Sequence, residues 1–281
     1  RLIHGEGDLL SGLVCDIYGP AASIKLSNPG LLPLIPILAD YVQKELSISD
    51  IYLEEEGQTP RALLGEKHEV EFIEQGLHFV AHLKEGQKTG YFLDQRENRR
   101  LLQKYANNRR VLDAFCYSGG FSVYALAGGA KEVMSVDLSE RAILWCVNNV
   151  KRNGPFTGEH KSLSEDCFSF LRTIKPKEFD LIVLDPPAFA KSAQAVERAA
   201  RGYKDINLCA LKALDSQGLL FTFSCSQHIS ADLFKKIIFA AAKDSGRNVS
   251  ILHELSQAPD HPVSIYCPQS SYLKGLVLRV D

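Results

Sequence analysis

Residues 110–137 read RVLDAFCYSGGFSVYALAGGAKEVMSVD, and the expected architecture follows from them. RVLDAFC is typical of a strand, GGFSVYALAGGA of a helix that glycines end, and KEVMSVD of a second strand. Strand, helix and strand in succession form the repeating unit of a parallel sheet with helices on its faces. Ligands bind such sheets beyond the carboxyl ends of the strands, so a functional site is expected there.

The same alternation continues to the end of the chain. SERAILWCVNNVKRNG predicts a helix with Ser139 as its N-cap, and DCFSFLRTI, GYKDINLCALKAL and ADLFKKIIFAAAKDSG predict further helices. FDLIVLD and GLLFTFSC are unbroken apolar runs, as in parallel strands that are buried on both faces. NVSILHEL and LKGLVLRV are expected to be the closing strands. The pattern predicts a doubly wound, Rossmann-like α/β sheet.

The first part of the chain has shorter elements. LLPLIPILADYVQKEL predicts a helix, and EVEFIEQGLHFVAHL predicts a hairpin that turns near Gln75 and Gly76. We therefore expect a small, β-rich α+β domain at residues 1–85, followed by the sheet domain at residues 86–281. Within the second domain, LDQRENRRLLQKYA predicts an amphipathic helix whose arginines form a solvated face.

Composition excludes several classes of protein. The 281 residues are 45% hydrophobic and 23% charged, which is ordinary for a globular protein. No apolar run approaches the ~18 residues of a membrane span, and the N-terminus lacks a signal-type apolar core, so we expect a cytoplasmic protein that does not bind membranes. A net charge of −2 provides no global field for nucleic acid, although a local basic path remains compatible with it.

The cysteines and histidines do not predict a metal site. The seven cysteines are odd in number and form no C-x-x-C pair, which argues against a disulfide framework and against zinc. His78 and His82 lie in a predicted strand without an acidic partner, so we interpret them as structural.

The loop after the first strand of the sheet suggests a cofactor without a pyrophosphate. It carries Tyr117, Ser118 and Gly119, but it is not the G-x-G-x-x-G dinucleotide fingerprint. Asp137, at the end of the next strand, is placed to accept hydrogen bonds from ribose hydroxyls, and Asp113 ends the strand before the loop. A tight turn and a helix cap are the structural alternatives. Together the residues favour an adenosine ligand, and S-adenosylmethionine fits that description.

Two further residues are candidates for the same cofactor. Asp166 opens a predicted helix beside the expected adenine, where it could bind the amino group or simply cap the helix. Phe92 lies in TGYFLDQRENRR, just before the sheet, and is expected to cover the cofactor; packing in the core explains this ring equally well.

The sequence VLDPPAF places a carboxylate directly after a buried strand. Two prolines fix a rigid turn and orient Asp185. Methyltransferases that act on exocyclic amino groups usually carry an aromatic ring immediately after Pro-Pro. Here Ala188 intervenes and Phe189 follows it, which weakens an N-methylation interpretation.

Cys225 lies in TFSCS, at the end of the next predicted strand, so it should be a neighbour of Asp185. A thiolate that adds to carbon 6 of a pyrimidine makes carbon 5 nucleophilic, and a nearby carboxyl can stabilise the adduct. Cys225 and Asp185 are the candidate catalytic residues for this chemistry. The alternative is that Cys225 is a small core residue, because free cysteine is often buried.

A basic segment lies between these two strands. FAKSAQAVERAARGYKDIN carries cations that are candidates for RNA phosphate contacts, together with the Phe189 ring, although a charge run is usually only a solvated face. The cations are Lys191, Arg198, Arg201 and Lys204.

Taken together, these motifs resemble a known family. RLIHGEGDLLSGLVCDIYG, TGYFLDQRENRR, DAFCYSGGFS, DPPAFAKS, RGYKDIN, TFSCS and LKGLVLRV are similar, in order, to the PUA-linked bacterial 23S rRNA cytosine-5 methyltransferases. The resemblance implies a class I, S-adenosylmethionine-dependent fold whose last strand is antiparallel. It also implies Cys225 as nucleophile and Asp185 as the motif carboxylate. Ala188 departs from the family, in which lysine is common.

The resemblance leads to one expected function and leaves others open. We expect 5-methylcytosine formation in 23S rRNA; the alternatives are guanine N-methylation on the same fold and a non-catalytic adenosine- and RNA-binding module. Relatives carry an RNA-binding PUA domain at the N-terminus, and whether one precedes this chain is left open. Whether the protein forms a homodimer is also left open.

Overall fold

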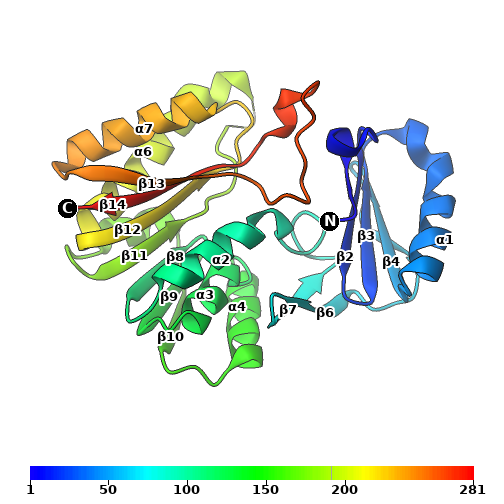
Figure 1. Ribbon diagram of the computed structural model, residues 1–281, viewed down its shortest axis with the longest axis horizontal. Helices are drawn as coiled ribbons and strands as arrows, with labels where there is room; N and C mark the ends of the chain where they lie inside the picture. Colours follow the sequence, from blue (N-terminus) through cyan, green and yellow to red (C-terminus); the bar gives the residue numbers. More distant parts are fainter. Residues whose placement is uncertain (191) are drawn as a thin grey trace. The chain divides into compact units, whose positions relative to one another are not determined.

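The computed structural model describes residues 1–190 and 192–281, and these residues separate into two compact units (Figure 1). The units differ from the expected limits of 1–85 and 86–281, because the first extends further and also takes in a segment from near the C-terminus. Unit 1 is Arg1–Arg96 with Ala258–Ser270, and unit 2 is Glu97–Gln257 with Ser271–Asp281.

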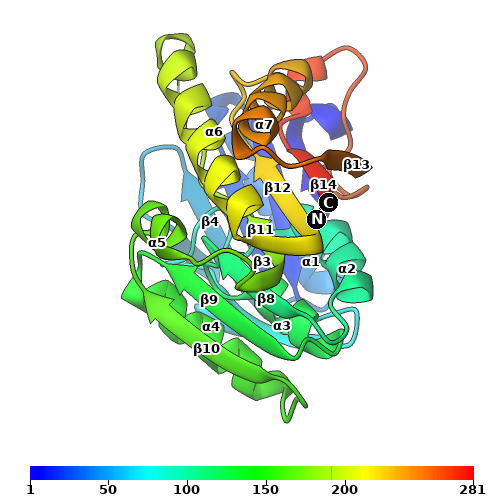
Figure 2. The same ribbon diagram turned by 90° about the vertical axis from the view of Figure 1, so that its left-hand side faces the viewer.

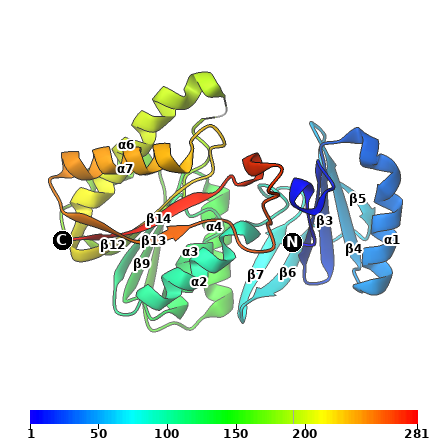
Figure 3. The same ribbon diagram turned by 45° about the horizontal axis from the view of Figure 1, so that its top comes forward.

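Unit 1 contains a five-stranded sheet in the order β1-β2-β3-β4-β5. Helix α1 (Ile35–Glu45) covers one face of it (Figure 3), and the side chains of Ile35 and Val42 are buried there. The strands are β1 Ile3–His4, β2 Leu13–Tyr18, β3 Ala21–Leu26, β4 Asp50–Glu55 and β5 Arg61–Leu64. Short 3₁₀ helices of this unit are Gly5–Asp8, Pro29–Leu34, Leu93–Gln95 and Pro268–Ser270.

The expected hairpin is confirmed as β6 (Glu69–Glu74) and β7 (Leu77–His82). Gln75 and Gly76 join the strands with φ of 52° and 84°. Positive φ at both turn residues matches the right-handed twist of a two-residue hairpin, which is why the pair Gln-Gly serves here.

The returning segment Ala258–Ser270 is held in unit 1 by polar contacts. The Ala258 amide donates to the carbonyl oxygen of Asp94 at 2.9 Å, and Arg96 Nη1 donates to Asp260 Oδ2 at 2.7 Å. Asp260 Oδ1 lies 2.9 Å from the His261 ring nitrogen. The contacts of Ala258 with Asp94 and of Asp260 with Arg96 join positions far apart in the sequence, so no local pattern could have indicated them.

Unit 2 contains a seven-stranded sheet in the order β10-β9-β8-β11-β12-β14-β13. The pairs from β10 through β12 are parallel, and β14 is antiparallel to both of its neighbours. The expected mostly parallel sheet with an antiparallel last strand is therefore confirmed. The strands are β8 Arg110–Ala114, β9 Glu132–Asp137, β10 Glu159–Ser164, β11 Phe179–Leu184, β12 Leu214–Ser224, β13 Val249–Leu255 and β14 Lys274–Val280.

Helices cover both faces of this sheet, with α3 and α4 on one side and α6 and α7 on the other (Figure 2). Helix α2 lies beside α3 (Figure 1). The expectation that the α2 arginines form a solvated face is wrong for Arg99, which is 2% exposed and lies 5.9 Å from the centre of the Tyr124 ring. The helices are α2 Arg96–Tyr105, α3 Gly120–Ala127, α4 Glu140–Asn153, α5 Cys167–Thr173, α6 Val196–Ala213 and α7 Ala231–Ser245, with a 3₁₀ turn at Ala193–Ala195.

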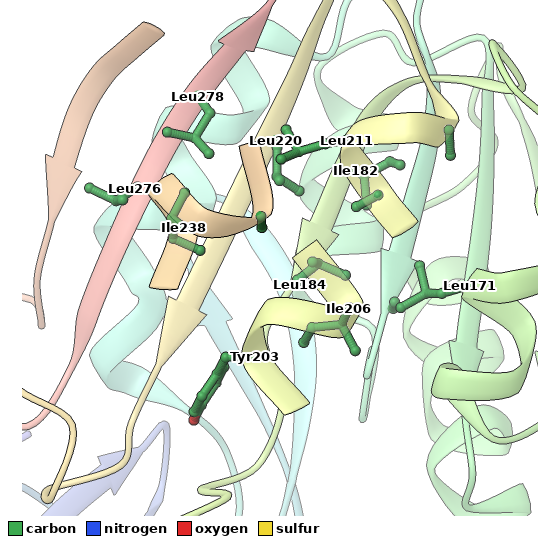
Figure 4. Close-up of a cluster of buried hydrophobic side chains, with 14 of the residues drawn as sticks. Leu171, Ile182, Leu184, Tyr203, Ile206, Leu211, Leu220, Ile238, Leu276 and Leu278 are labelled. Atoms are coloured by element: carbon green, nitrogen blue, oxygen red, sulfur yellow. The ribbon is translucent and has the colours of Figure 1, made fainter. Parts of the chain in front are cut away.

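The core beneath α5, α6 and α7 is apolar, with many leucine and isoleucine side chains and a few aromatic rings. Leu220 of β12 and Leu278 of β14 are buried in it with Ile182 of β11, and Figure 4 shows their side chains converging with those of the helices. Burying one such side chain stabilises the fold by about 2 kcal/mol, whereas an exposed ion pair contributes about 0.5 kcal/mol. Packing of this face therefore dominates the energetics that hold the strand ends in place.

The strand register aligns the carboxyl ends of the parallel strands. Ala114 of β8 pairs with Leu184 of β11, which pairs with Thr222 of β12. On the other side Ala114 pairs with Val136 of β9. The loops that follow these strands therefore begin at one edge of the sheet, with the reversal of strand order between β8 and β11.

An ion pair at the opposite edge of the sheet, where β8 and β11 begin, contributes to the stability of the fold. Arg110 donates from its amide and Nε to Asp180 Oδ2 at 2.8 and 3.0 Å, and from Nη2 to Oδ1 at 2.7 Å, which joins the starts of β8 and β11. Burial alone would raise the pKa of Asp180, but the Arg110 hydrogen bonds outweigh it and hold the pKa below its ordinary value of 3.8. A carboxyl with a lowered folded-state pKa stabilises the fold above its unfolded-state pKa, and this contribution disappears as pH falls through the folded-state value.

We therefore expect Asp180→Asn to lower the free energy of unfolding by about 1 kcal/mol at pH 7. Urea titrations between pH 7 and pH 3 should show the difference from the native chain shrinking at acid pH. Glu197→Gln, which removes an exposed ion pair with Arg201, is the control and should change little. A deficit that grows as pH falls would contradict this account.

Candidate active site at the carboxyl edge of the sheet

The loop after β8 has an unusual backbone. Phe115 and Tyr117 have φ of 64° and 48°, and Gly119 has φ of 78°. Left-handed conformations are costly for residues with side chains, especially bulky ones, and tend to persist at sites where the surroundings enforce them. This loop therefore has the character of a built binding loop rather than an ordinary tight turn.

Hydrogen bonds to β9 and α4 hold the loop. The Tyr117 amide donates to Asp137 Oδ2 at 2.9 Å, and Asn149 Nδ2 of α4 donates to the Ser118 carbonyl at 2.9 Å. Asp137 Oδ1 also accepts from the Ser139 amide at 2.9 Å. A carboxylate has about four acceptor positions, so Asp137 retains capacity for a ligand hydroxyl. The structure thus brings together Tyr117, Ser118 and Asp137, as the sequence predicted for a cofactor site.

Gly119 is required by space as well as by its backbone angle. A Cβ at this position would lie 2.4 Å from Cys146 Sγ and 3.0 Å from its Cβ. Cys146 is fully buried in α4, so it has little freedom to move aside. The close approach of loop and helix needs glycine at position 119.

Asp113 lies below the loop rather than in it. It is 1% exposed, its Oδ2 accepts from Ser122 Oγ at 2.6 Å, and Ser122 Oγ lies 2.6 Å from Ser135 Oγ. Burial raises the pKa of Asp113 well above its ordinary value. These contacts favour a supporting role, and direct contact of Asp113 with a cofactor stays a prediction.

Two buried polar atoms test whether a cofactor fits at this end of β8. Within the described residues, Ser118 Oγ and Asp113 Oδ1 have no hydrogen-bond partner. Buried polar atoms are nearly always hydrogen-bonded, so unsatisfied ones beside a strained loop suit a polar ligand. The residues here fit an adenosine-type cofactor with a charged tail.

Asp166 is the N-cap of α5. It accepts from the Ser169 amide and from Ser169 Oγ, both at 2.9 Å. Burial tends to raise the pKa of Asp166, but these hydrogen bonds outweigh it and lower the pKa. The contacts of Asp166 are therefore those of a helix cap, the alternative considered from the sequence. Binding of adenine by Asp166 stays a prediction.

Cys225 and the Pro-Pro turn after Asp185 meet at the same edge. The half-buried Cys225 Sγ lies 3.9 Å from the carbonyl oxygen of Pro186. Ser226 joins the two segments, because its Oγ accepts from the Ala190 amide at 3.2 Å. The expectation that the β11 and β12 ends are neighbours is confirmed.

The predicted RNA-contacting residues fall into different environments. Phe189 packs inward, with its ring centre 4.5 Å from that of Tyr203. Arg198 is exposed on α6, Arg201 pairs with Glu197, and Lys204 Nζ lies 2.6 Å from Asp244 Oδ2. Exposed ion pairs are weak and exchange readily for other anions, so both cations stay candidates for phosphate contacts.

For two of the predicted site residues the role stays a prediction. Lys191 lies outside the described residues. Phe92 belongs to unit 1, where the Lys88 ammonium lies 4.4 Å from the centre of its ring. The predicted covering of the cofactor by Phe92 stays a prediction.

Lys274 is the residue that the sequence interpretation missed. Its Nζ donates to the carbonyl oxygens of Ser226 and Tyr272, each at 2.7 Å, which places a cation beside Cys225. The expected antiparallel last strand could have indicated Lys274 as a site residue, because such a strand begins at the edge where the parallel strands end.

The described residues contain neither a metal cluster nor a membrane-spanning helix. Across residues 1–190 and 192–281, no three or more His, Cys, Asp or Glu side chains are grouped to hold a metal ion. None of the helices described is long and apolar enough to cross a membrane.

Comparison with known proteins identifies relatives of the whole chain. The S-adenosylmethionine-dependent methyltransferase family matches residues 41–264. Ribosomal RNA large subunit methyltransferase I of Tolumonas auensis is 40% identical over 99% of this chain and 74% of its own length.

Solved structures agree with these relatives. A Streptococcus mutans protein assigned as an S-adenosylmethionine-dependent methyltransferase is similar with a TM-score of 0.87 and 25% identity, over 100% of this chain and 74% of that one. A second structure with the same values, also of a protein assigned as a methyltransferase, is complexed with SAH. The expected class I methyltransferase fold with an N-terminal β-rich region is therefore confirmed.

Gly119→Ala provides a test of the loop. A left-handed alanine costs about 1–2 kcal/mol, and overlap with Cys146 adds to it. We expect affinity for S-adenosylmethionine, measured by calorimetry, to fall by at least about tenfold, which is about 1.4 kcal/mol. Gly57→Ala is the matched control, because Gly57 has φ of 77° and nothing within 4 Å of the added Cβ. Equal cofactor affinity in the two variants would show that the loop does not hold the cofactor.

Proposed function

The chain belongs to the S-adenosylmethionine-dependent methyltransferase family, and we propose that it is an enzyme that forms 5-methylcytosine in 23S rRNA through Cys225. Its cofactor is S-adenosylmethionine. The observation that carries the proposal is the placement of the Cys225 thiol 3.9 Å from the Pro186 carbonyl oxygen, in the turn that follows Asp185.

Support for the substrate comes from relatives. The Tolumonas auensis relative is named as a methyltransferase of the large-subunit ribosomal RNA, and 40% identity over almost the whole chain favours the same class of substrate here. From the resemblance to PUA-linked enzymes we propose that an RNA-binding PUA module would assist this domain. We also propose that the protein acts in the cytoplasm.

Support for the base comes from the thiol. Carbon 5 of cytosine is a poor nucleophile until a thiolate adds to carbon 6. We propose that Cys225 forms the carbon–sulfur bond and that the electron pair of the 5,6 double bond makes carbon 5 nucleophilic. After methylation a base removes the proton from carbon 5, the carbon–sulfur bond breaks, and the thiolate is regenerated. The target base has to leave its stack to reach the thiol.

The carboxyl edge supplies the remaining groups. Tyr117, Ser118, Gly119 and Asp137 would hold S-adenosylmethionine, which when bound supplies the methyl group. Asp185 would hold a proton at ring nitrogen 3 and so stabilise the adduct. Exposed cations of α6, Arg198 and its neighbours, would contact RNA phosphates.

The packing of Phe189 bears on the guanine N-methylation alternative. Methyltransferases that act on exocyclic amino groups usually carry the aromatic ring immediately after Pro-Pro, whereas here Ala188 intervenes before Phe189. Here the ring packs against Tyr203 at 4.5 Å and against Phe168 at 5.5 Å. The inward packing favours the cytosine proposal.

Mechanism-based trapping tests the proposal. RNA that contains 5-fluorocytosine cannot release its carbon 5 substituent, so the native enzyme with S-adenosylmethionine should form a stable covalent adduct, visible by denaturing electrophoresis and mass spectrometry. Cys225→Ala should form none and should transfer methyl at least about 1000-fold more slowly, because a nucleophile that forms the intermediate is removed.

Cys209→Ser is the matched control, since Cys209 is also a half-buried free thiol and lies on α6. It should form the adduct normally. Methyl transfer at the native rate by Cys225→Ala would contradict the assignment of Cys225 as the nucleophile. Nucleoside analysis of rRNA from cells with and without the protein then identifies the base, and methylguanine in place of 5-methylcytosine would move the assignment to the alternative.

A further inference from the structure

We propose that Lys274 is a positioning residue that keeps Cys225 in its reactive thiolate form. The inference deepens the proposed function and rests on the role given there to Cys225 as a nucleophile. It names the group that activates the thiol, which neither the motif around Cys225 nor the resemblance to relatives provides.

The topology brings the two residues together. β14 is inserted between β12 and β13 and runs antiparallel to both, so its first residue lies at the edge where β12 ends. Lys274 is paired in register with Ser224, the residue directly before Cys225. The position of the lysine is therefore set by a strand pair rather than by a loop.

Hydrogen bonds fix the ammonium group. Lys274 Nζ donates to the carbonyl oxygen of Ser226, the residue directly after Cys225, and to that of Tyr272, both at 2.7 Å. The side chain is only half-buried along its length. An ammonium has three donors, and two are used by these carbonyls within the described part of the chain. Two anchors on backbone atoms restrict a long flexible side chain to one position, at the carbonyl of the residue that follows Cys225.

The electrostatic coupling between the two groups is mutual. Burial lowers the pKa of Lys274, and the negative charge of Cys225 raises it again. The interaction free energy between the thiolate and the ammonium is the same for both groups. The charge that stabilises the ammonium form of Lys274 is therefore itself stabilised by Lys274, and this lowers the pKa of the thiol. Thiolates beside a lysine, arginine or protonated histidine are the reactive ones in proteins.

Among the described residues, the other titratable groups near Cys225 do not replace this cation. Burial raises the pKa of Tyr203, whose hydroxyl lies 3.0 Å from Ser226 Oγ, so the phenol is neutral at neutral pH. Asp185 carries the same sign of charge as a thiolate and opposes its formation. His228 is exposed to solvent. A thiolate beside a carboxylate needs a fixed cation, and within residues 1–190 and 192–281 Lys274 provides one.

The test measures the thiol directly, without RNA or cofactor. Iodoacetamide alkylates only the thiolate, forming a carbon–sulfur bond and releasing iodide, so the rate at Cys225 as a function of pH reports its pKa. Mass spectrometry of the Cys225 peptide separates this thiol from the other cysteines. We expect the native protein to give a midpoint below the ordinary ~8.5 of cysteine.

Lys274→Gln keeps two amide donors for the two carbonyls and removes the charge. We expect its alkylation midpoint to rise by about one pH unit, so that the rate at pH 6.5 falls by about tenfold while the plateau at high pH stays the same. Lys274→Arg, which keeps the charge, should recover most of the native profile. Lys235→Gln, which removes an exposed pair with Glu254 in the same unit, should leave the profile unchanged.

Two outcomes would overturn the inference. One is a Lys274→Gln profile that coincides with the native one. The other, which needs no variant, is a native midpoint at or above that of ordinary cysteine. A lowered midpoint in the native chain without adduct formation on 5-fluorocytosine RNA would instead leave the Lys274 inference standing and remove the proposed reaction.

Discussion

The chemistry of this protein depends on one geometric constraint, the parallel register of β8, β11 and β12. The aligned residues Ala114, Leu184 and Thr222 lie within two residues of the ends of their strands. The segments that follow carry the loop at Tyr117, the turn at Asp185 and the thiol of Cys225. A shift of one residue in any strand would turn its side chains to the opposite face and move its loop. The apolar layer under α6 and α7 prevents such a shift, because each strand would expose buried leucine or isoleucine side chains. Packing far from the site thus sets the geometry of the site.

The loop at this edge has an unfavourable backbone conformation, and its free-energy cost is offset by interactions elsewhere in the fold. Two residues with side chains, Phe115 and Tyr117, adopt left-handed backbone angles, each at a cost of about 1–2 kcal/mol. The Asp137 carboxylate and the Asn149 amide hold the loop in this form before any ligand arrives. Pre-organisation of this kind lowers the entropy that a ligand loses on binding. Asp137 therefore contributes to cofactor binding in the proposed function even through bonds that it makes to the protein itself.

Much of this arrangement could be predicted from the sequence, and the failures have physical causes. Alternating apolar strands and helices with clear caps, such as Ser139, indicated the sheet because these signals are local. β10 was missed, since EHKSLS is a polar edge strand without an apolar face. Arg99 was placed on the surface because its burial depends on packing against Tyr124 in another helix. Asp113 and Asp166 match a pattern expected of ligand contacts, but Oδ2 of each accepts a hydrogen bond from Ser122 or Ser169, and the local sequence does not indicate these contacts. Lys274 was quoted within a motif without a role, because its value comes from a strand pairing about 50 residues away in the sequence.

The insertion of β14 between β12 and β13 has two structural effects. It covers the edge of β12, whose unpaired backbone would otherwise invite association with other chains. Because it runs against its neighbours, it also begins where they end, and its first side chain enters the site from the side opposite to β11. Burying an ammonium there costs free energy that a hydrophobic residue would not cost, and two backbone carbonyls recover only part of it. A charge retained at such a position is best explained by a charge that it faces. In the proposed function the thiolate of Cys225 is that charge, and the strand order of the sheet would then connect the stability of the fold to the reactivity of the proposed nucleophile.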